Sequence, residues 1–173
     1  VGRGVFATAA VVLHGPNEYT LDFIQSIVHP SRVAARIVLP PKVAVQFTAA
    51  LGEAIGKYAQ SFGGPPREPS RPAAPKPDQA GEPGQSAGPA GGAGAGGARQ
   101  EPPIADIYEQ LKLPDEMLGG VYANVVSITH TGSEFCFDFI AQFFPRSAVT
   151  ARVYMAASRV PDFHASLKRS TGS

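Results

Sequence analysis

The first third of the chain alternates apolar and polar residues in a way that predicts a sheet. Tyr19, Leu21 and Phe23 alternate with polar neighbours, which is the period-two signature of a strand with one face on a core. The apolar stretches 5–13 and 32–39 flank this strand and are expected to form two more. The stretch 5–13 has so few polar residues that we expect it to be buried on both faces over much of its length.

A helix is predicted directly after the third strand. Pro40 and Pro41 suit the first turn of a helix, and Gly63 and Gly64 suit its end. Between them, apolar residues recur every three or four positions and form one stripe. The stripe consists of Val43, Phe47, Leu51, Ile55, Tyr58 and Phe62.

The same set of elements is predicted a second time near the C-terminus. Residues 4–55 align without a gap on residues 120–171, an offset of 116, and fifteen of the 52 aligned pairs are identical. The second copy predicts strands at 121–129, 135–139 and 148–155, turn residues at 145–147, and a helix from about Ser158. A short amphipathic helix is expected ahead of it, with Ile104, Ile107, Tyr108 and Leu111 on one face. An internal repeat of this kind outweighs the other signals in the chain.

The segment between the copies has a different composition. The chain holds 17 Pro and 19 Gly, and ten of each lie between residues 63 and 103. Residues 64–103 contain no aromatic or long aliphatic residue, so they bury too little apolar surface to offset chain entropy. We therefore expect three parts: a β-β-β-α repeat at 1–63, a disordered Pro/Gly/Ala-rich linker at 64–103, and a short helix plus a second β-β-β-α repeat at 104–173.

Neither repeat is expected to be stable alone. A unit of about 60 residues buries only roughly 60% of its unfolded surface, and a three-stranded sheet leaves its edges unpaired. Pairing of the two repeats solves both problems. The sequence therefore predicts an α+β fold in which the repeats form an intramolecular pseudo-dimer.

Several of the repeated residues resemble a known family. The second copy reads G-V-Y-A-N from Gly120, then H-x3-E-F-x-x-D-F-I from His130, then A-R-V before the helix. This pattern is similar to the prokaryotic family of domains of unknown function 3467, present here as two tandem copies. It covers 120–140 and 151–155, and more weakly 4–24 and 35–62, with Thr8 in place of the motif's asparagine (Asn124). The resemblance implies a β-β-β-α unit that works in pairs and brings no assigned activity.

Charge and cysteine content exclude several classes of protein. Fifteen Lys and Arg against fourteen Asp and Glu give a net charge of +1, which provides no electrostatic argument for a nucleic acid or an anionic membrane. We find no apolar run long enough for a membrane span and no leader-like segment. The single cysteine, Cys136, excludes an internal disulfide and a cysteine-rich zinc site. These features favour a cytoplasmic location.

Two sets of polar residues recur in both copies. His14 with Glu18, and His130 with Glu134, flank the first hairpin and are expected to form charge-assisted pairs. Ligation of one metal by both sets, or general acid–base chemistry, are the alternatives. Asp22 with Arg36, and Asp138 with Arg152, lie on neighbouring strands and are expected to form bidentate pairs that hold register. A polar floor for a ligand is the alternative for these four.

Two further features are interpreted as not functional. The G-x-G-x-x-G at Gly92, Gly94 and Gly97 lacks the strand and helix that a dinucleotide site needs. Cys136 aligns with Thr20, so the position does not require sulfur, and we interpret the cysteine as structural.

The interpretation favoured by these residues is a non-enzymatic protein-interaction or assembly module with no cofactor. Its expected partners are the repeats themselves, paired in cis or in trans, and a protein not identified by the sequence, with no membrane involved. The alternative is a single-stranded nucleic-acid-binding protein of Whirly or Pur-alpha-like architecture, an analogy of fold alone. It requires exposed aromatic residues for base stacking.

Overall fold

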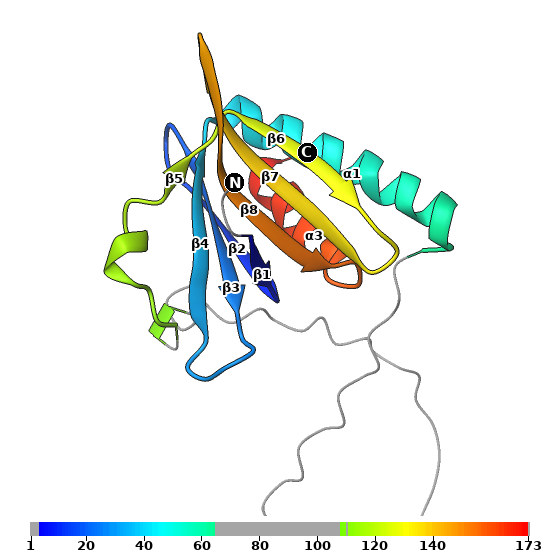
Figure 1. The fold of residues 1–173 in the computed structure, drawn as a ribbon, viewed down its shortest axis with the longest axis horizontal. Helices are drawn as coiled ribbons and strands as arrows, with labels where there is room; N and C mark the ends of the chain where they lie inside the picture. The colour runs from blue at the N-terminus through cyan, green and yellow to red at the C-terminus, as the bar shows by residue number, and fades with distance from the viewer. Residues whose placement is uncertain (1–3, 65–107, 110, 173) are drawn as a thin grey trace, which may run out of the picture.

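The first predicted strand is divided in two, and its parts belong to different sheets. The computed structural model describes residues 4–64, 108–109 and 111–172 (Figure 1). In the first half, β1 (Val5–Ala7) ends before Thr8, and β2 (Ala9–His14) begins after it. The expected continuous strand over 5–13 is therefore wrong, and so is its burial on both faces, because β2 leaves Ala9 and His14 exposed.

The remaining elements of the first half follow the predicted order. β3 (Tyr19–Gln25) pairs antiparallel with both β2 and β4 (Arg32–Leu39). The helix α1 (Pro41–Phe62) starts with Pro41 in its first turn. It ends at Gly63, which has a φ of 79° and donates its backbone N–H to the carbonyl of Ala59. Gly63 thus supplies the left-handed cap that the sequence predicts.

The second half repeats this order, and its last two strands are longer than β3 and β4. Its elements are η1 (Asp115–Met117), β5 (Val121–Tyr122), β6 (Val125–His130), β7 (Glu134–Phe143), β8 (Arg146–Ala156) and α3 (Val160–Thr171). Arg146 and Ser147, expected in a turn, lie in β8, since β7 and β8 extend as a paired hairpin to Phe143 and Arg146. Helix α3 begins at Val160, two residues after the predicted start.

Each half contributes its first short strand to the sheet of the other half. The two four-stranded sheets have the orders β1-β8-β7-β6 and β2-β3-β4-β5. Val5 lies opposite Val153 in a parallel pair, and Val121 lies opposite Ile37 in the same way. Because 121 and 153 are 116 positions from 5 and 37, the two exchanges are equivalent. The three-stranded sheets expected from the sequence are therefore completed by a fourth strand from the opposite repeat.

The two halves also share one hydrophobic core. Helices α1 and α3 pack against each other, and each contacts the other half, α1 on β6 and α3 on β2. In Figure 1 both helices lie behind the sheets. Phe23 contacts Phe139, with ring centroids 5.6 Å apart, although one stands in each sheet. A core of this kind makes the chain an α+β pseudo-dimer rather than two separate units.

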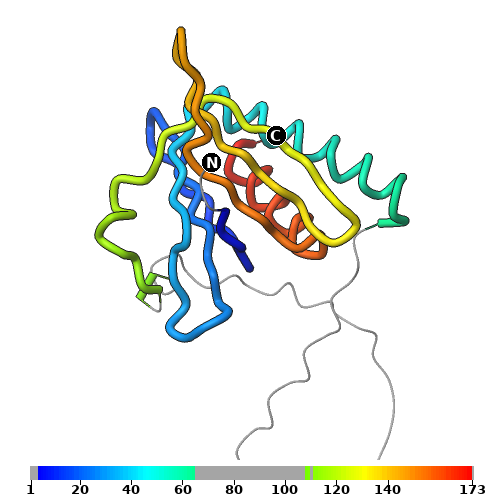
Figure 2. The backbone as a smooth tube through the Cα atoms, viewed as in Figure 1, coloured from blue at the N-terminus to red at the C-terminus, as the bar shows by residue number. Residues whose placement is uncertain are grey.

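The segment that leads into the second repeat lies along the first sheet. Tyr108 and Glu109 are helical, as predicted, whereas Ile104 and Ile107 lie outside the described residues. Figure 2 shows the green stretch from about residue 111 to β5 running beside β4. Its contact with β4 is a parallel bridge between Lys112 and Arg32. Residues 65–103, which are the predicted linker without Gly64 and contain its glycine motif, also lie outside the described residues.

Candidate functional site

Asp22 and Arg36 form a bidentate ion pair across two neighbouring strands. The residues stand opposite each other in the β3–β4 register. Arg36 donates from Nε to Oδ1 and from Nη2 to Oδ2 of Asp22, both at 2.7 Å. The Asp22 side chain is fully buried, and its hydrogen bonds raise the pKa of the Arg36 guanidinium above its ordinary value. The pair expected from the sequence is thus present, and its charges are directed at each other.

The segment before the second repeat covers this first pair. The Tyr108 hydroxyl donates a hydrogen bond to Oδ2 of Asp22. Burial and this hydrogen bond to a carboxylate raise the pKa of the Tyr108 phenol above its ordinary value. Arg36 Nη1 also donates to the carbonyl of Leu118, at 3.2 Å. Asp22 and Arg36 therefore contact Tyr108 and Leu118 in addition to each other.

Gly120 allows the covering segment to approach Arg36. Its φ is 63°, a left-handed conformation that favours glycine. A Cβ atom at this position would lie 2.8 Å from Cγ of Arg36 and 3.1 Å from its carbonyl oxygen. The glycine that begins the repeated pattern therefore serves close backbone packing.

Asp138 and Arg152 form the equivalent pair in the other half. Arg152 donates from Nε and Nη2 to the two carboxylate oxygens at 2.5 and 2.6 Å, and Asp138 raises the pKa of the guanidinium. This pair is more exposed than the first, with 29% of the Arg152 side chain and 21% of the Asp138 side chain accessible. Among the described residues, no tyrosine donates to Asp138.

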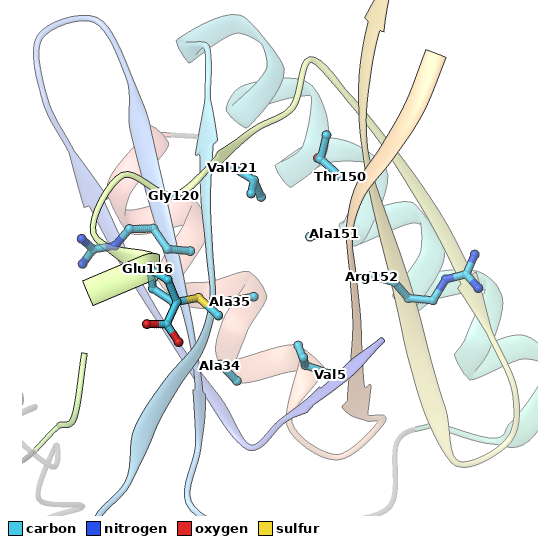
Figure 3. Close-up of a pocket in the computed structure, with 11 residues that line it drawn as sticks. Val5, Ala34, Ala35, Glu116, Gly120, Val121, Thr150, Ala151 and Arg152 are labelled. Carbon is cyan, nitrogen blue, oxygen red and sulfur yellow. The ribbon is translucent and has the colours of Figure 1, made fainter. Parts of the chain in front are cut away.

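A small cavity lies between the two sheets and is lined by equivalent residues of both halves. Its volume is about 200 Å³. The equivalent residues that line it are Val5 and Val121, Ala34 and Thr150, Ala35 and Ala151, and Arg36 and Arg152. In Figure 3 the Arg152 guanidinium points away from the cavity. Sites for small organic ligands usually measure about 300–1,000 Å³. The cavity is smaller than such sites and its charged Arg152 end points out of it, so we do not interpret it as a ligand site. The alternative of a polar floor formed by the two Asp–Arg pairs stays a prediction.

The histidine–glutamate pairs expected at the hairpins are not formed. Within the described chain, neither histidine makes a hydrogen bond or ion pair with its glutamate. His14 instead packs against the ring of Tyr19, with centroids 5.9 Å apart. His130 lies among Tyr58, Phe62 and Phe135, and its Nδ1 is buried without a partner. Aromatic rings of α1 and β7 therefore surround His130, and Glu134 instead accepts a hydrogen bond from the Ser133 hydroxyl.

Cys136 stands on β7, opposite Tyr154 of β8. Burial, followed by the nearby Asp138 carboxylate, raises the pKa of its thiol above the ordinary value. A raised pKa lowers the thiolate fraction, so the position does not favour nucleophilic chemistry. In the parts of the chain that the structure describes, no three His, Cys, Asp or Glu side chains come together as a metal site.

An exposed apolar surface at the β7–β8 hairpin is the feature that sequence reasoning missed. We call it the hairpin patch and define it as Tyr122, Phe143 and Phe144, each exposed. Tyr122 and Phe143 stack with ring centroids 5.8 Å apart, and Phe144 is fully exposed. The signal in the sequence is the doublet Phe143-Phe144, which breaks the alternation of β7. The equivalent doublet, Ile27-Val28, is also exposed.

Fold and site together define a two-fold α+β protein with exchanged strands and two internal Asp–Arg pairs. The model of one protein family matches residues 1–65 and 81–171, which is most of the chain. The family is described as a protein of unknown function (DUF3467), and the chain belongs to it. The match is a single one, divided around a central gap. No curated protein is significantly similar to this chain.

None of the described helices is long and apolar enough to cross a membrane.

Proposed function

We propose that this protein is a non-enzymatic interaction module, built from two tandem copies of the DUF3467 unit that form one rigid body. The observation that carries the proposal is the hairpin patch. Tyr122 of β5 and Phe143 of β7 stack while exposed, and Phe144, in the turn between β7 and β8, has no cover from the rest of the described chain. Exposed clusters of large apolar residues in otherwise well-packed proteins mark interaction surfaces.

The shape of the patch supports binding to another protein. Aromatic side chains supply the largest contributions to protein–protein affinity when they enter a partner's pocket. The hairpin that bears Phe143 and Phe144 projects beyond the rest of its sheet (Figure 1). A projecting hairpin with aromatic residues at its tip can insert these side chains into a partner without a rearrangement of the shared core.

The polar pairs support a structural role for the interior. In both halves the two carboxylate oxygens of the Asp accept hydrogen bonds from the Arg guanidinium. A carboxylate held in this way has little capacity left to act as a general base. The rigid body formed by the two halves therefore serves to present the surface.

Affinity capture with mass spectrometry tests the proposal. We expect the whole chain to capture one or a few proteins, with and without nuclease treatment. Loss of these proteins on the double substitution Phe143→Ser and Phe144→Ser would support the patch as the binding surface. The matched control is Ile27→Ser with Val28→Ser, which changes the equivalent exposed doublet in the first half. Capture that does not depend on Phe143 and Phe144 would contradict the proposal.

Binding of single-stranded nucleic acid is the second candidate, and one observation favours it. The stacked rings of Tyr122 and Phe143 are exposed, and Arg146 lies opposite Phe143 in the hairpin. Exposed aromatic rings next to a cation suit base stacking and phosphate contact. Fluorescence anisotropy with a labelled oligothymidine, at two salt concentrations, tests this candidate. Salt-sensitive binding that is lost with Phe143→Ser would favour it over a protein partner.

A further inference from the structure

The hairpin patch is assembled from two different sheets. Tyr122 belongs to β5, which pairs with β4 of the first half, whereas Phe143 belongs to β7 of the other sheet. The two rings stack with centroids 5.8 Å apart. The carbonyl of Tyr122 also accepts a hydrogen bond from the Thr150 hydroxyl of β8, at 3.1 Å. The position of the Tyr122 ring therefore depends on how β5 is held between the sheets.

Strand β5 is too short to fix its own position. It contains two residues, which pair with Ile37 and Val38 of β4. Strands usually have three to ten residues, so β5 depends on the segments at its two ends. At its C-terminal end, Ala123 is fully buried and donates its backbone N–H to the carbonyl of Val38 at 3.0 Å.

Arg36 holds the chain at the N-terminal end of β5. Its Nη1 donates to the carbonyl of Leu118 at 3.2 Å, four residues before Tyr122. Gly120 packs against the side chain and the carbonyl of Arg36, as described above, and directly precedes β5. Arg36 also precedes the two residues of β4 with which β5 pairs. The same residue thus contacts β5's lead-in and lies next to its strand partners.

Asp22 connects the two ends of this lead-in. Its carboxylate accepts from Arg36 and from the Tyr108 hydroxyl, and the Asp22 side chain is fully buried. None of the described residues from 108 to 122 is buried, so hydrogen bonds rather than core packing hold this segment on β4. Segments held in this way open at a lower free energy than the core does.

We infer that Tyr108, Asp22 and Arg36 form a latch that positions Tyr122 in the hairpin patch. When the latch is closed, β5 lies on β4 and the Tyr122 ring is held against Phe143. When it is open, β5 keeps only its C-terminal anchor, and the patch loses one of its two stacked rings. The three residues act on binding through β5 and are positioning residues. The inference rests on the proposed function, because it names what controls the same surface.

Fluorine NMR of the whole chain labelled with 3-fluorotyrosine reports the position of Tyr122. The chain has five tyrosines, and Tyr122→Phe assigns the signal by its loss. The ring current of Phe143 shifts this signal while the two rings are stacked. Phe143→Ser therefore gives the position of the signal without the contact.

Gly120→Ala opens the latch directly. The added Cβ atom would lie 2.8 Å from Cγ of Arg36, at a backbone φ of 63°. We expect the Tyr122 signal to move toward the position that Phe143→Ser gives. The matched control is Gly119→Ala, where a Cβ atom meets nothing within 4 Å beyond its chain neighbours. This control should leave the signal unchanged.

Tyr108→Phe is the second variant and keeps the test decisive if Gly120→Ala does not fold. It removes one hydrogen bond to a carboxylate, which should shift the equilibrium toward the open latch about tenfold. The Tyr122 signal should move in the same direction as in Gly120→Ala. The matched control is Tyr19→Phe, which removes a hydroxyl bonded to the carbonyl of Ser170 and should not move the signal.

A Tyr122 signal that stays in place in both Gly120→Ala and Tyr108→Phe would overturn the inference. Equal shifts in the two control variants would overturn it as well. In the capture experiment, Tyr108→Phe should weaken binding of the proteins that the hairpin patch captures. Capture that needs the patch but is unchanged by Tyr108→Phe would overturn the inference alone. Capture that does not need the patch would contradict the proposed function, while the fluorine signals still decide whether the latch positions Tyr122.

Discussion

Phe47 packs against Phe163, the residue 116 positions further along the chain, with ring centroids 6.0 Å apart. His164 likewise contacts its equivalent, since its Nε2 lies 3.1 Å from the carbonyl oxygen of Thr48. Contacts between equivalent residues occur where a two-fold axis passes through an interface. The axis of this pseudo-dimer therefore runs through the crossing of α1 and α3, and each half provides part of the other's core.

Separation of the halves tests this interdependence. When residues 1–64 and 104–173 are expressed as two chains, we expect them to associate as a one-to-one complex, because β1 and β5 have their strand partners in the opposite half. Residues 1–64 alone should form a homodimer that reproduces the exchange. Analytical ultracentrifugation of each half and of the mixture measures this, and two stable monomers that do not associate would contradict the shared core.

Truncation of Phe47 should be strongly destabilising. The side chain is 2% exposed and contacts Phe137, Phe139 and Phe163. Phe47→Ala should lower the free energy of unfolding by about 3–5 kcal/mol, as large core truncations do. Phe144→Ala makes the same change at a fully exposed residue and should change stability by less than about 0.5 kcal/mol. Urea unfolding followed by circular dichroism compares the two, and equal losses would contradict the packing.

The two Asp–Arg pairs should differ in their contribution to stability. Asp22→Asn leaves Arg36 without a counter-charge in a buried site and should cost about 3–5 kcal/mol. Asp138→Asn acts on a pair that water already reaches, and should therefore cost much less. Thermal and urea unfolding of both variants provide the measurement. A larger loss at Asp138 would show that the covering segment does not bury the first pair.

Tyr108 should make stability depend on pH in the alkaline range. Its pKa is raised in the folded chain above the ordinary value near 10. The stabilisation that accompanies a raised pKa is fully present below the unfolded value and is lost as the pH rises through the folded value. Tyr108→Phe should therefore be less stable than the unaltered chain at neutral pH, and the difference should shrink at alkaline pH.

The ionisation of the Tyr108 phenol can be followed directly by the absorbance of tyrosinate. The chain has five tyrosines and no tryptophan, so the signal is not masked. The difference between titrations of the unaltered chain and Tyr108→Phe should show a midpoint above that of a free tyrosine. A midpoint at the free value would contradict the hydrogen bond to Asp22.

Local patterns predicted the elements and one of the two sets of polar pairs. The alternation of Tyr19, Leu21 and Phe23 and the helical stripe through Phe47 are set by side-chain periodicity, which the sequence displays directly. Asp22 and Arg36 were predicted to pair because their strands are neighbours along the chain, where a hairpin leaves little choice of register. The His–Glu prediction failed because it considered only the hairpin, while Tyr58 and Phe62 of α1 surround His130 from the opposite half.

The sequence by itself determined the elements, the duplication with its offset of 116, and the need for the halves to pair. Only the tertiary structure decided that β1 and β5 change sheets. Strand pairing is made by backbone groups common to all residues, so the stretch 5–13 reads the same whether it continues in one sheet or crosses at Thr8. The tertiary structure also decided the asymmetry of the two pairs. Asp22 and Asp138 stand in the same sequence pattern, and the tertiary structure adds a hydrogen bond from Tyr108 to the first of them, which is fully buried.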